Sequence, residues 1–168
     1  MESALKAPLK VKVLILRGQN IVRLSDSITT FRNLETLSLE QNKGIYMNDA
    51  LVTLSNLKKL SSLNISNCDI DAVLVNIKLL KQLKVLKLGG NKLTGLPDEI
   101  SELKKLKELT FSQYPDDFRS FSLDEKKKIV NALPHCKILL EDYFGGAHGK
   151  CRLGQRVVRV TPQNVNTL

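Results

Sequence analysis

The spacing of apolar residues from Leu83 to Leu106, LKVLKLGGNKLTGLPDEISELKKL, constrains this chain more than any other feature. Counted from the first leucine, the apolar residues fall at offsets 0, 3, 5, 10, 13, 17 and 20, which neither one helix nor one strand requires. Alternation around Leu86 and Leu88 predicts a short strand, Asn91 predicts a turn, and residues 93–103 predict a return segment. This stretch therefore predicts one coil of a solenoid.

The same pattern repeats along the chain. With the first leucine of that coil numbered as position 1, positions 1, 4 and 6 are apolar in six successive coils. The eighteen residues at these positions are Val11, Leu14, Leu16, Leu34, Leu37, Leu39, Leu60, Leu63, Ile65, Leu83, Leu86, Leu88, Leu106, Leu109, Phe111, Leu133, Cys136 and Ile138. The intervals between coils are 23, 26, 23, 23 and 27 residues, within the roughly 20 to 29 residues of such a repeat.

The central coil resembles the leucine-rich repeat family. Residues 83–93 carry the LxxLxLxxNxL signature, Leu96–Ile100 carry an LPxxI continuation, and the likeness extends over about Val11 to Glu141. The 23-residue intervals are similar to those of the bacterial type. This resemblance implies an α/β, right-handed solenoid with a short parallel sheet on its concave face and an irregular or short-helical convex face. It also implies that the activity is binding rather than catalysis.

Position 9 of each coil has to satisfy backbone groups where the chain leaves the strand. Asn42, Cys68 and Asn91 occupy this position in the middle coils, as the family pattern requires. The assignment makes Cys68 a structural residue rather than a reactive thiol. The three cysteines of the chain are scattered and odd in number, so they indicate neither a disulfide framework nor a zinc site.

The return segments are expected to differ between coils. In the longest internal coil, Asn48 or Asp49 predicts the start of a short helix over Ala50–Ser55. The coils that contain Val73 and Leu96-Pro97 have room only for a turn or a loose 3₁₀ segment. The convex face is therefore predicted to be uneven.

The C-terminal end carries its own signals. Ser122-Leu-Asp-Glu125 is a capping box, which predicts a helix through about Leu133 with Leu123 on its apolar face. A closing strand is expected over Lys137–Leu140. This ending resembles the LPxC-type C-terminal cap of bacterial leucine-rich repeat proteins.

These patterns divide the chain into a lead-in over residues 1–10, a repeat domain of about five coils with its cap over residues 11–142, and a basic tail over residues 143–168. The lead-in is too short to cover the first coil, which predicts either self-association at that edge or a parent protein with more sequence upstream. The tail has no acidic residue and few apolar ones, which predicts a flexible segment. The alternative is an extra strand through Val157–Val160.

Outward residues at positions 3, 5 and 7 of each strand form the concave side, which these solenoids usually offer to partners. This surface is polar and lacks aromatic anchors, and Arg17 is its one residue of a type enriched at binding hot spots. The alternative is that these are ordinary solvated strand residues. The candidate protein-binding residues are Arg17, Ser38, Glu40, Asn64, Lys87 and Thr110.

A basic stripe is predicted along one flank of the stack, at the two positions before each strand. Such a stripe can hold phosphates or acidic partners, whereas the plainer interpretation is a solvated edge, since no aromatic residues are interleaved for base stacking. The candidate polyanion-binding residues are Arg32, Lys58, Lys59, Lys81, Lys104 and Lys105. The net charge of +9 divides into +5 for residues 1–142 and +4 for the remainder, so the repeat body is only mildly basic.

Catalysis, metals and cofactors find no support in the sequence. His135 and His148 have no Asp or Glu placed by sequence to orient them as bases. The run from Gly145 to Lys150 departs from a phosphate loop at Phe144 and Cys151. We therefore expect no enzyme activity, no metal site and no cofactor.

The remaining hypotheses concern binding. With 168 residues and 42% apolar residues the chain can form one continuous core, and it has no run of the roughly 20 apolar residues that span a membrane and no secretory signal. A cytoplasmic location is expected. The first hypothesis is a non-catalytic protein-interaction module whose partner is another protein. The alternatives are a binder of nucleic acid or another polyanion, which is less favoured, and an extracellular ligand-sensing fragment of a larger receptor.

Overall fold

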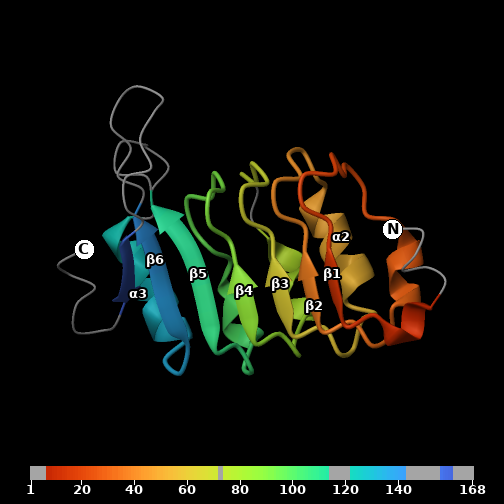
Figure 1. Ribbon diagram of the computed structural model, residues 1–168. Helices are drawn as coiled ribbons and strands as arrows, with labels where there is room; N and C mark the ends of the chain where they lie inside the picture. The colour runs from red at the N-terminus through yellow and green to blue at the C-terminus, as the bar shows by residue number, and fades with distance from the viewer. Residues whose placement is uncertain (1–6, 72–73, 114–121, 143–155, 161–168) are drawn as a thin grey trace.

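Parallel strands stacked in chain order form the frame of the protein. The computed structural model describes residues 7–71, 74–113, 122–142 and 156–160. The strands are β1 (Val13–Ile15), β2 (Thr36–Ser38), β3 (Ser62–Asn64), β4 (Val85–Lys87), β5 (Glu108–Gln113), β6 (Lys137–Asp142) and β7 (Arg156–Val160). Each strand from β1 to β6 pairs in parallel with the next along the chain, and β7 pairs antiparallel with β6 (Figure 1).

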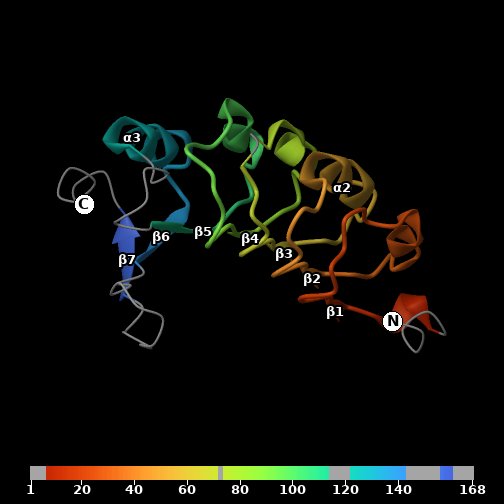
Figure 2. The same cartoon turned by 90° about the horizontal axis from the view of Figure 1, so that it is seen from above.

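Helical segments return the chain on the opposite side of each coil. They are η1 (Pro8–Lys10), η2 (Asp26–Thr30), α2 (Met47–Leu54), η3 (Val75–Leu79), η4 (Asp98–Glu102) and α3 (Leu123–Ala132). Viewed from above, the strands follow the inner side of an arc, and α2, α3 and the other helical returns follow its outer side (Figure 2). The architecture is the α/β solenoid with an open sheet that the sequence predicts, and the uneven convex face is confirmed.

The predicted helix in the second coil begins earlier than expected. It runs from Met47 rather than Ala50, and its N-cap residue Tyr46 makes no side-chain capping bond. Asn48 does not cap this helix; its Oδ1 accepts instead from the backbone N–H of Asn76, 3.3 Å away in the next coil. The local sequence predicts that Asn48 caps the helix, but in the structure its side chain bonds the next coil instead.

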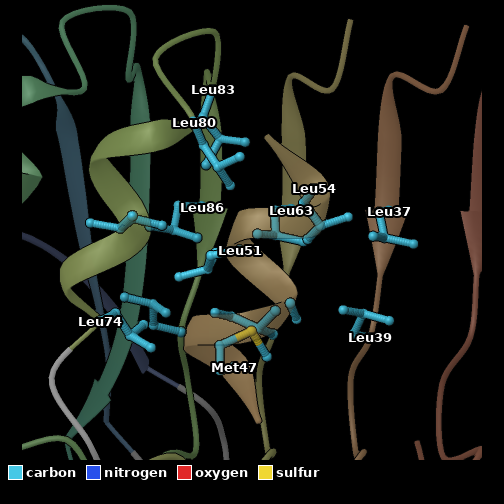
Figure 3. Close-up of a cluster of buried hydrophobic side chains, with 14 of the residues drawn as sticks. Leu37, Leu39, Met47, Leu51, Leu54, Leu63, Leu74, Leu80, Leu83 and Leu86 are labelled. Carbon is cyan, nitrogen blue, oxygen red and sulfur yellow. The ribbon is translucent and has the colours of Figure 1, made fainter. Parts of the chain in front are cut away.

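Position 4 of the repeat forms the centre of the core. Leu37, Leu63 and Leu86 lie opposite one another in register on neighbouring strands, and each is fully buried. Residues of the helical returns, including Met47 and Leu51 of α2, point toward them from the other side (Figure 3). Each leucine is covered by the coils above and below as well as by the return segment, which is how a coil that cannot bury its own face becomes stable.

The asparagines at position 9 bond the backbone of adjacent coils, as the sequence predicts. The buried Oδ1 of Asn42 accepts from the N–H groups of Gln19 and Ile21, each at 3.0 Å. Its Nδ2 donates to the carbonyls of Leu16 and Leu39 at 2.8 and 2.7 Å. The Asn42 side chain thus satisfies four backbone groups that have no strand partner where the chain leaves the sheet.

Asn91 and Cys68 continue this ladder. The Oδ1 of Asn91 accepts from the N–H groups of Cys68 and Ile70 at 3.0 and 3.2 Å, and its Nδ2 donates to the Leu88 carbonyl at 2.8 Å. The Cys68 thiol donates to the Leu39 carbonyl at 3.2 Å. Burial raises the pKa of this thiol above its usual value. The structural role predicted for Cys68 is confirmed.

A second turn position was missed by sequence reasoning. The residue before each ladder position adopts a left-handed backbone, with φ of 62° at Gly18, 62° at Gln41, 57° at Asn67 and 67° at Gly90. At Gly90 a Cβ atom would overlap the side chain of Asn67. Two glycines and an asparagine at the same repeat position were the available signal, because these residues tolerate positive φ at low cost.

The N-cap predicted at Ser122 for α3 is confirmed. The Oγ of Ser122 accepts from the backbone N–H of Glu125 at 3.2 Å. Ile129 and Val130 belong to the core, but Leu123, which lies on the same face of the helix as Val130, does not. Leu123 is 41% exposed, because it lies in the first turn of α3, two turns before Val130 and outside the core cluster.

The last parallel strand pairs in a different register from the one predicted. The repeat alignment equates Ile138 with Phe111, whereas the structure places Ile138 opposite Leu109, two residues away. Cys136 is consequently only half-buried, at the end of a turn in which its N–H donates to the Leu133 carbonyl at 3.0 Å. A shift of two residues keeps the same side chains on the same face of a strand, so alternation alone could not reveal it.

Part of the predicted flexible tail forms a strand. Residues 156–160 make β7, which pairs with β6 so that Val160 lies opposite Ile138 and Arg156 opposite Asp142. This is the alternative that the sequence left open, and here the expectation of a flexible segment is corrected. The rest of the tail, like residues 1–6 of the lead-in, lies outside the described residues.

Candidate functional site

The inner face of the sheet brings the predicted concave residues into rows. Residues at position 5 are in direct register, with Ile15 opposite Ser38, Ser38 opposite Asn64, and Asn64 opposite Lys87. Neighbouring strands lie about 4.8 Å apart, so these side chains form one continuous surface. The parallel pairing of short strands is what converts positions 23 to 26 residues apart in sequence into neighbours.

Arg17, Glu40 and Asn64 form a connected polar cluster on this face. The Nη2 of Arg17 lies 3.5 Å from Oε1 of Glu40, and the Nδ2 of Asn64 donates to Oε2 of Glu40 at 3.3 Å. The Nε of Arg17 also donates to Oε1 of Gln41 at 3.0 Å. Arg17 remains more than half exposed, so its pairing contributes about 0 to 1 kcal/mol to stability and leaves the guanidinium accessible to a partner.

The other predicted concave residues are placed differently. Ser38 is half-buried and Lys87 is exposed, so both are accessible on the inner face. Thr110 is only 4% exposed, and its selection as a binding residue is corrected. Its register neighbours on the flanking strands are the longer Lys87 and Leu139, between which a small side chain is recessed.

Two apolar residues on the same face were omitted from the predicted site. Val13 and Ile15 of β1 are 58% and 68% exposed, although both are large hydrophobic side chains. Their odd positions in an alternating strand predict outward orientation, which was the signal for including them. The inner face therefore changes from apolar at β1 to polar and mixed in charge from β2 to β4.

The predicted basic stripe is present as a row of exposed side chains. Arg32, Lys58 and Lys59 line one shallow hollow between the first and second coils, together with the carboxylate of Asp26. Lys81 instead pairs with Glu102, with 3.3 Å between Nζ and Oε2. These acidic partners reduce the attraction that the row could exert on an anion.

The remaining cations of the stripe lie apart from that hollow. Lys104 and Lys105 are exposed beyond η4 and do not line it. Lys58 and Lys59 also donate within the protein, to the Ser55 carbonyl at 2.9 Å and to Oδ1 of Asn33 at 2.7 Å. The structure thus brings three of the six predicted cations together.

No reactive or metal-binding cluster emerges in the described part of the chain. Desolvation by burial raises the pKa of the Cys136 thiol to about 11, which keeps it protonated at neutral pH. Among residues 7–71, 74–113, 122–142 and 156–160, no group of three His, Cys, Asp or Glu side chains is arranged to hold a metal ion. Within the same ranges, no helix is both long and apolar enough to cross a membrane.

Comparison with known proteins places the coil geometry in a family context. The family model described as Leucine Rich Repeat matches residues 82–103. A solved leucine-rich repeat protein of Leptospira interrogans is 27% identical, with a TM-score of 0.63 over 84% of this chain. An internalin of Listeria monocytogenes is 20% identical, with a TM-score of 0.55 over 82% of this chain. A search of curated proteins gives no match.

The likeness supports a leucine-rich repeat protein and confirms the fold class. The chain spans 34% of the length of the Leptospira structure and 36% of the internalin, so the activities of those whole proteins do not transfer directly. The internalin, at 20% identity, supports the fold alone. The bacterial 23-residue repeat type and the LPxC-type cap remain predictions.

Proposed function

We propose that this chain is a non-catalytic protein-interaction module whose concave sheet face contacts another protein. The observation that carries the proposal is the register of β1 to β4, which aligns Ile15, Ser38, Asn64 and Lys87 into one accessible row. Leucine-rich repeat solenoids are rigid platforms that offer such surfaces to partners. The fold and the family match support this class of function.

The chemistry of the face indicates a partner with a polar surface of mixed charge. Arg17 and Glu40 present opposite charges side by side, and Lys87 adds a cation two strands away. Non-obligate interfaces are about as polar as the rest of a protein surface and hold bridging water. Recognition would therefore rest on hydrogen bonds and charge complementarity around a small number of anchors.

Site-specific crosslinking in extract of the native host tests the position of this surface. A photo-reactive amino acid at Ser38 should form a covalent adduct with one defined protein, identified by mass spectrometry. The matched control is Val75, which is exposed on the outer side of the stack in η3. Adducts formed from Val75 and not from Ser38 would place the surface on the convex side.

A charge-reversal pair then tests the energetics. Lys87→Glu should weaken the complex, because an unfavourable charge replaces a favourable one at the interface. Lys105→Glu makes the same change in net charge at an exposed residue outside the concave face and should leave the affinity unchanged. Equal losses from both variants would indicate that only overall charge matters, which contradicts a defined concave site.

The other expectations belong to this proposal as well. The sequence-based prediction of self-association at the edge of β1 is tested by sedimentation, in which it would appear as a concentration-dependent dimer. The cytoplasmic location is tested by fractionation of the host. The fold and comparisons do not favour a polyanion-binding role, and absence of binding to generic DNA at low salt would remove it.

A further inference from the structure

The outer edge of β1 carries backbone groups that no described strand pairs with. The Lys12 carbonyl accepts from the Thr36 N–H at 3.0 Å, and the Leu16 N–H donates to the Ser38 carbonyl at 2.8 Å. Because alternate residues of a parallel strand bond to opposite sides, the N–H and C=O groups of Val13 and Ile15 point away from β2. Among the described strands, β1 has β2 as its single neighbour.

Apolar surface surrounds this edge on both sides of the sheet. On the inner face, Val13 and Ile15 are the exposed residues described above. On the core side, a small hollow of about 90 Å³ opens at the end of the stack, and its lining includes Leu16, Leu24 and Ile28. A strand added to β1 would direct alternate side chains toward these two apolar surfaces.

The net charge around the edge is positive. Residues 7–40 contain five Lys and Arg side chains and three carboxylates, those of Asp26, Glu35 and Glu40. Glu35 pairs with Lys12 at 3.1 Å and Glu40 with Arg17 at 3.5 Å, which leaves an excess of two positive charges. Lys10 and Lys12 lie at one end of β1 and Arg17 at the other, all exposed. Pairing with a second copy at this edge would bring these cations against one another, an arrangement that disfavours association.

We propose that the free edge of β1 binds an extended segment of a partner protein by strand addition, and that this segment has alternating apolar residues with Asp or Glu at both ends. The Val13 and Ile15 backbone groups form the hydrogen bonds, the hollow beside Leu16 receives apolar side chains, and Lys10, Lys12 and Arg17 hold the acidic ends. This surface shares Ile15 and Arg17 with the concave face, but its hydrogen bonds come from the outer edge of β1 rather than from the inner face of the sheet.

Hydrogen exchange on the free protein tests whether the edge is open. The amides of Val13 and Ile15 should exchange quickly, whereas those of Leu14 and Ser38 should be slow because they lie in the ladder between β1 and β2. Slow exchange at Val13 and Ile15 in the monomer would mean that another part of the chain already covers the edge. That result would overturn the proposal.

A synthetic peptide supplies the binding test. The probe is a fluorescent peptide of alternating Val and Thr with two Glu residues at each end, and its partner probe replaces every Glu with Lys. The Glu peptide should bind and slow the exchange of the Val13 and Ile15 amides, and the Lys peptide should not bind. Equal affinity for the two peptides would overturn the charge assignment, and absence of Glu-peptide binding would overturn the site.

Two variants separate the contribution of charge from that of the backbone hydrogen bonds. Lys10→Gln/Lys12→Gln should weaken binding of the Glu peptide by about tenfold, and Lys104→Gln/Lys105→Gln, with the same loss of charge four coils away from the edge, should not. Val13→Pro removes an N–H that does not bond to β2, so it should abolish binding and leave Tm nearly unchanged.

Sedimentation tests whether a second copy of the chain, rather than an acidic segment, occupies the edge of β1. The protein should stay monomeric, since its edge repels a second copy. A dimer that forms without peptide and is lost in Val13→Pro would assign the edge to self-association and overturn the acidic-segment proposal. Neither outcome bears on the concave face, whose test uses Ser38 and Lys87.

Discussion

The two ends of the solenoid differ in how the core of the terminal coil is covered. At the C-terminal end, α3 and β6 add Ile129, Val130 and Ile138 to the core beside a fully buried Leu109. At the N-terminal end, Leu14 is still 8% exposed, whereas its equivalents in the next coils are fully buried. A coil in the middle is covered by copies of itself, but a terminal coil needs a different sequence to cover it.

Truncating the leucine at position 4 near each end is expected to have the largest effect. Leu109→Ala should lower the free energy of unfolding by about 2 to 5 kcal/mol, because the cavity is enclosed by β4, β6 and the return segments. Leu14→Ala should cost only about 1 to 2 kcal/mol, since water already reaches that coil. Urea denaturation gives both values. Equal costs would show that the first coil is covered as closely as the fifth.

Substitutions at position 9 test the same difference between the middle of the stack and its N-terminal end. Asn91→Ala should cost about 1 to 3 kcal/mol, because it leaves backbone N–H and C=O groups without partners in the middle of the stack. Gln19 occupies the same position in the first coil, where it is exposed, and Gln19→Ala should be nearly neutral. Denaturation midpoints compare the two. A neutral Asn91→Ala would mean that water replaces its bonds.

Capping residues at the two ends should differ by less. Ser122→Ala should destabilise by about 0.5 to 2 kcal/mol through loss of the cap on α3, a helix that covers the core. Ser25→Ala removes the bond from Ser27 N–H at the start of η2, a longer contact of 3.3 Å on an exposed five-residue segment. Its cost should be smaller. The reverse order would indicate that the N-terminal end controls overall unfolding.

The Cys136 thiol should report on opening of the C-terminal cap. Its pKa is raised from 9.0 to about 11 by burial, so the neutral thiol stabilises the fold fully below pH 9 and this contribution is lost as pH rises toward 11. At pH 8, alkylation should be much slower in the folded protein than in urea. Peptide mapping by mass spectrometry measures the rate of alkylation at Cys136. Equal rates in the two conditions would show that the cap opens freely.

Repetition made most of the fold predictable. Each of the first five coils repeats the same apolar spacing, so an alignment at position 4 correctly pairs Leu14, Leu37, Leu63, Leu86 and Leu109 across β1 to β5. The ladder role of Asn42, Cys68 and Asn91 follows from the same alignment. The candidate concave residues were located for the same reason, since outward positions alternate with buried ones.

The exceptions occur where contacts between coils override the repeat. Thr110 occupies an outward position, but it is only 4% exposed between its register neighbours Lys87 and Leu139. Asn48 was expected to cap its own helix and instead bonds Asn76 in the next coil. In both cases the deciding neighbour lies more than 20 residues away in sequence.

Local spacing determined the coil, its buried face and its turn residues, because these depend on residues within one repeat. The register of Ile138 and the addition of β7 through Val157–Val160 were decided by tertiary structure alone. A strand shifted by two residues buries the same face, so its alternation is equally consistent with both registers. The choice between them depends on which hydrogen bonds and side chains the preceding strand offers, and that information lies in the assembled sheet rather than in the strand itself.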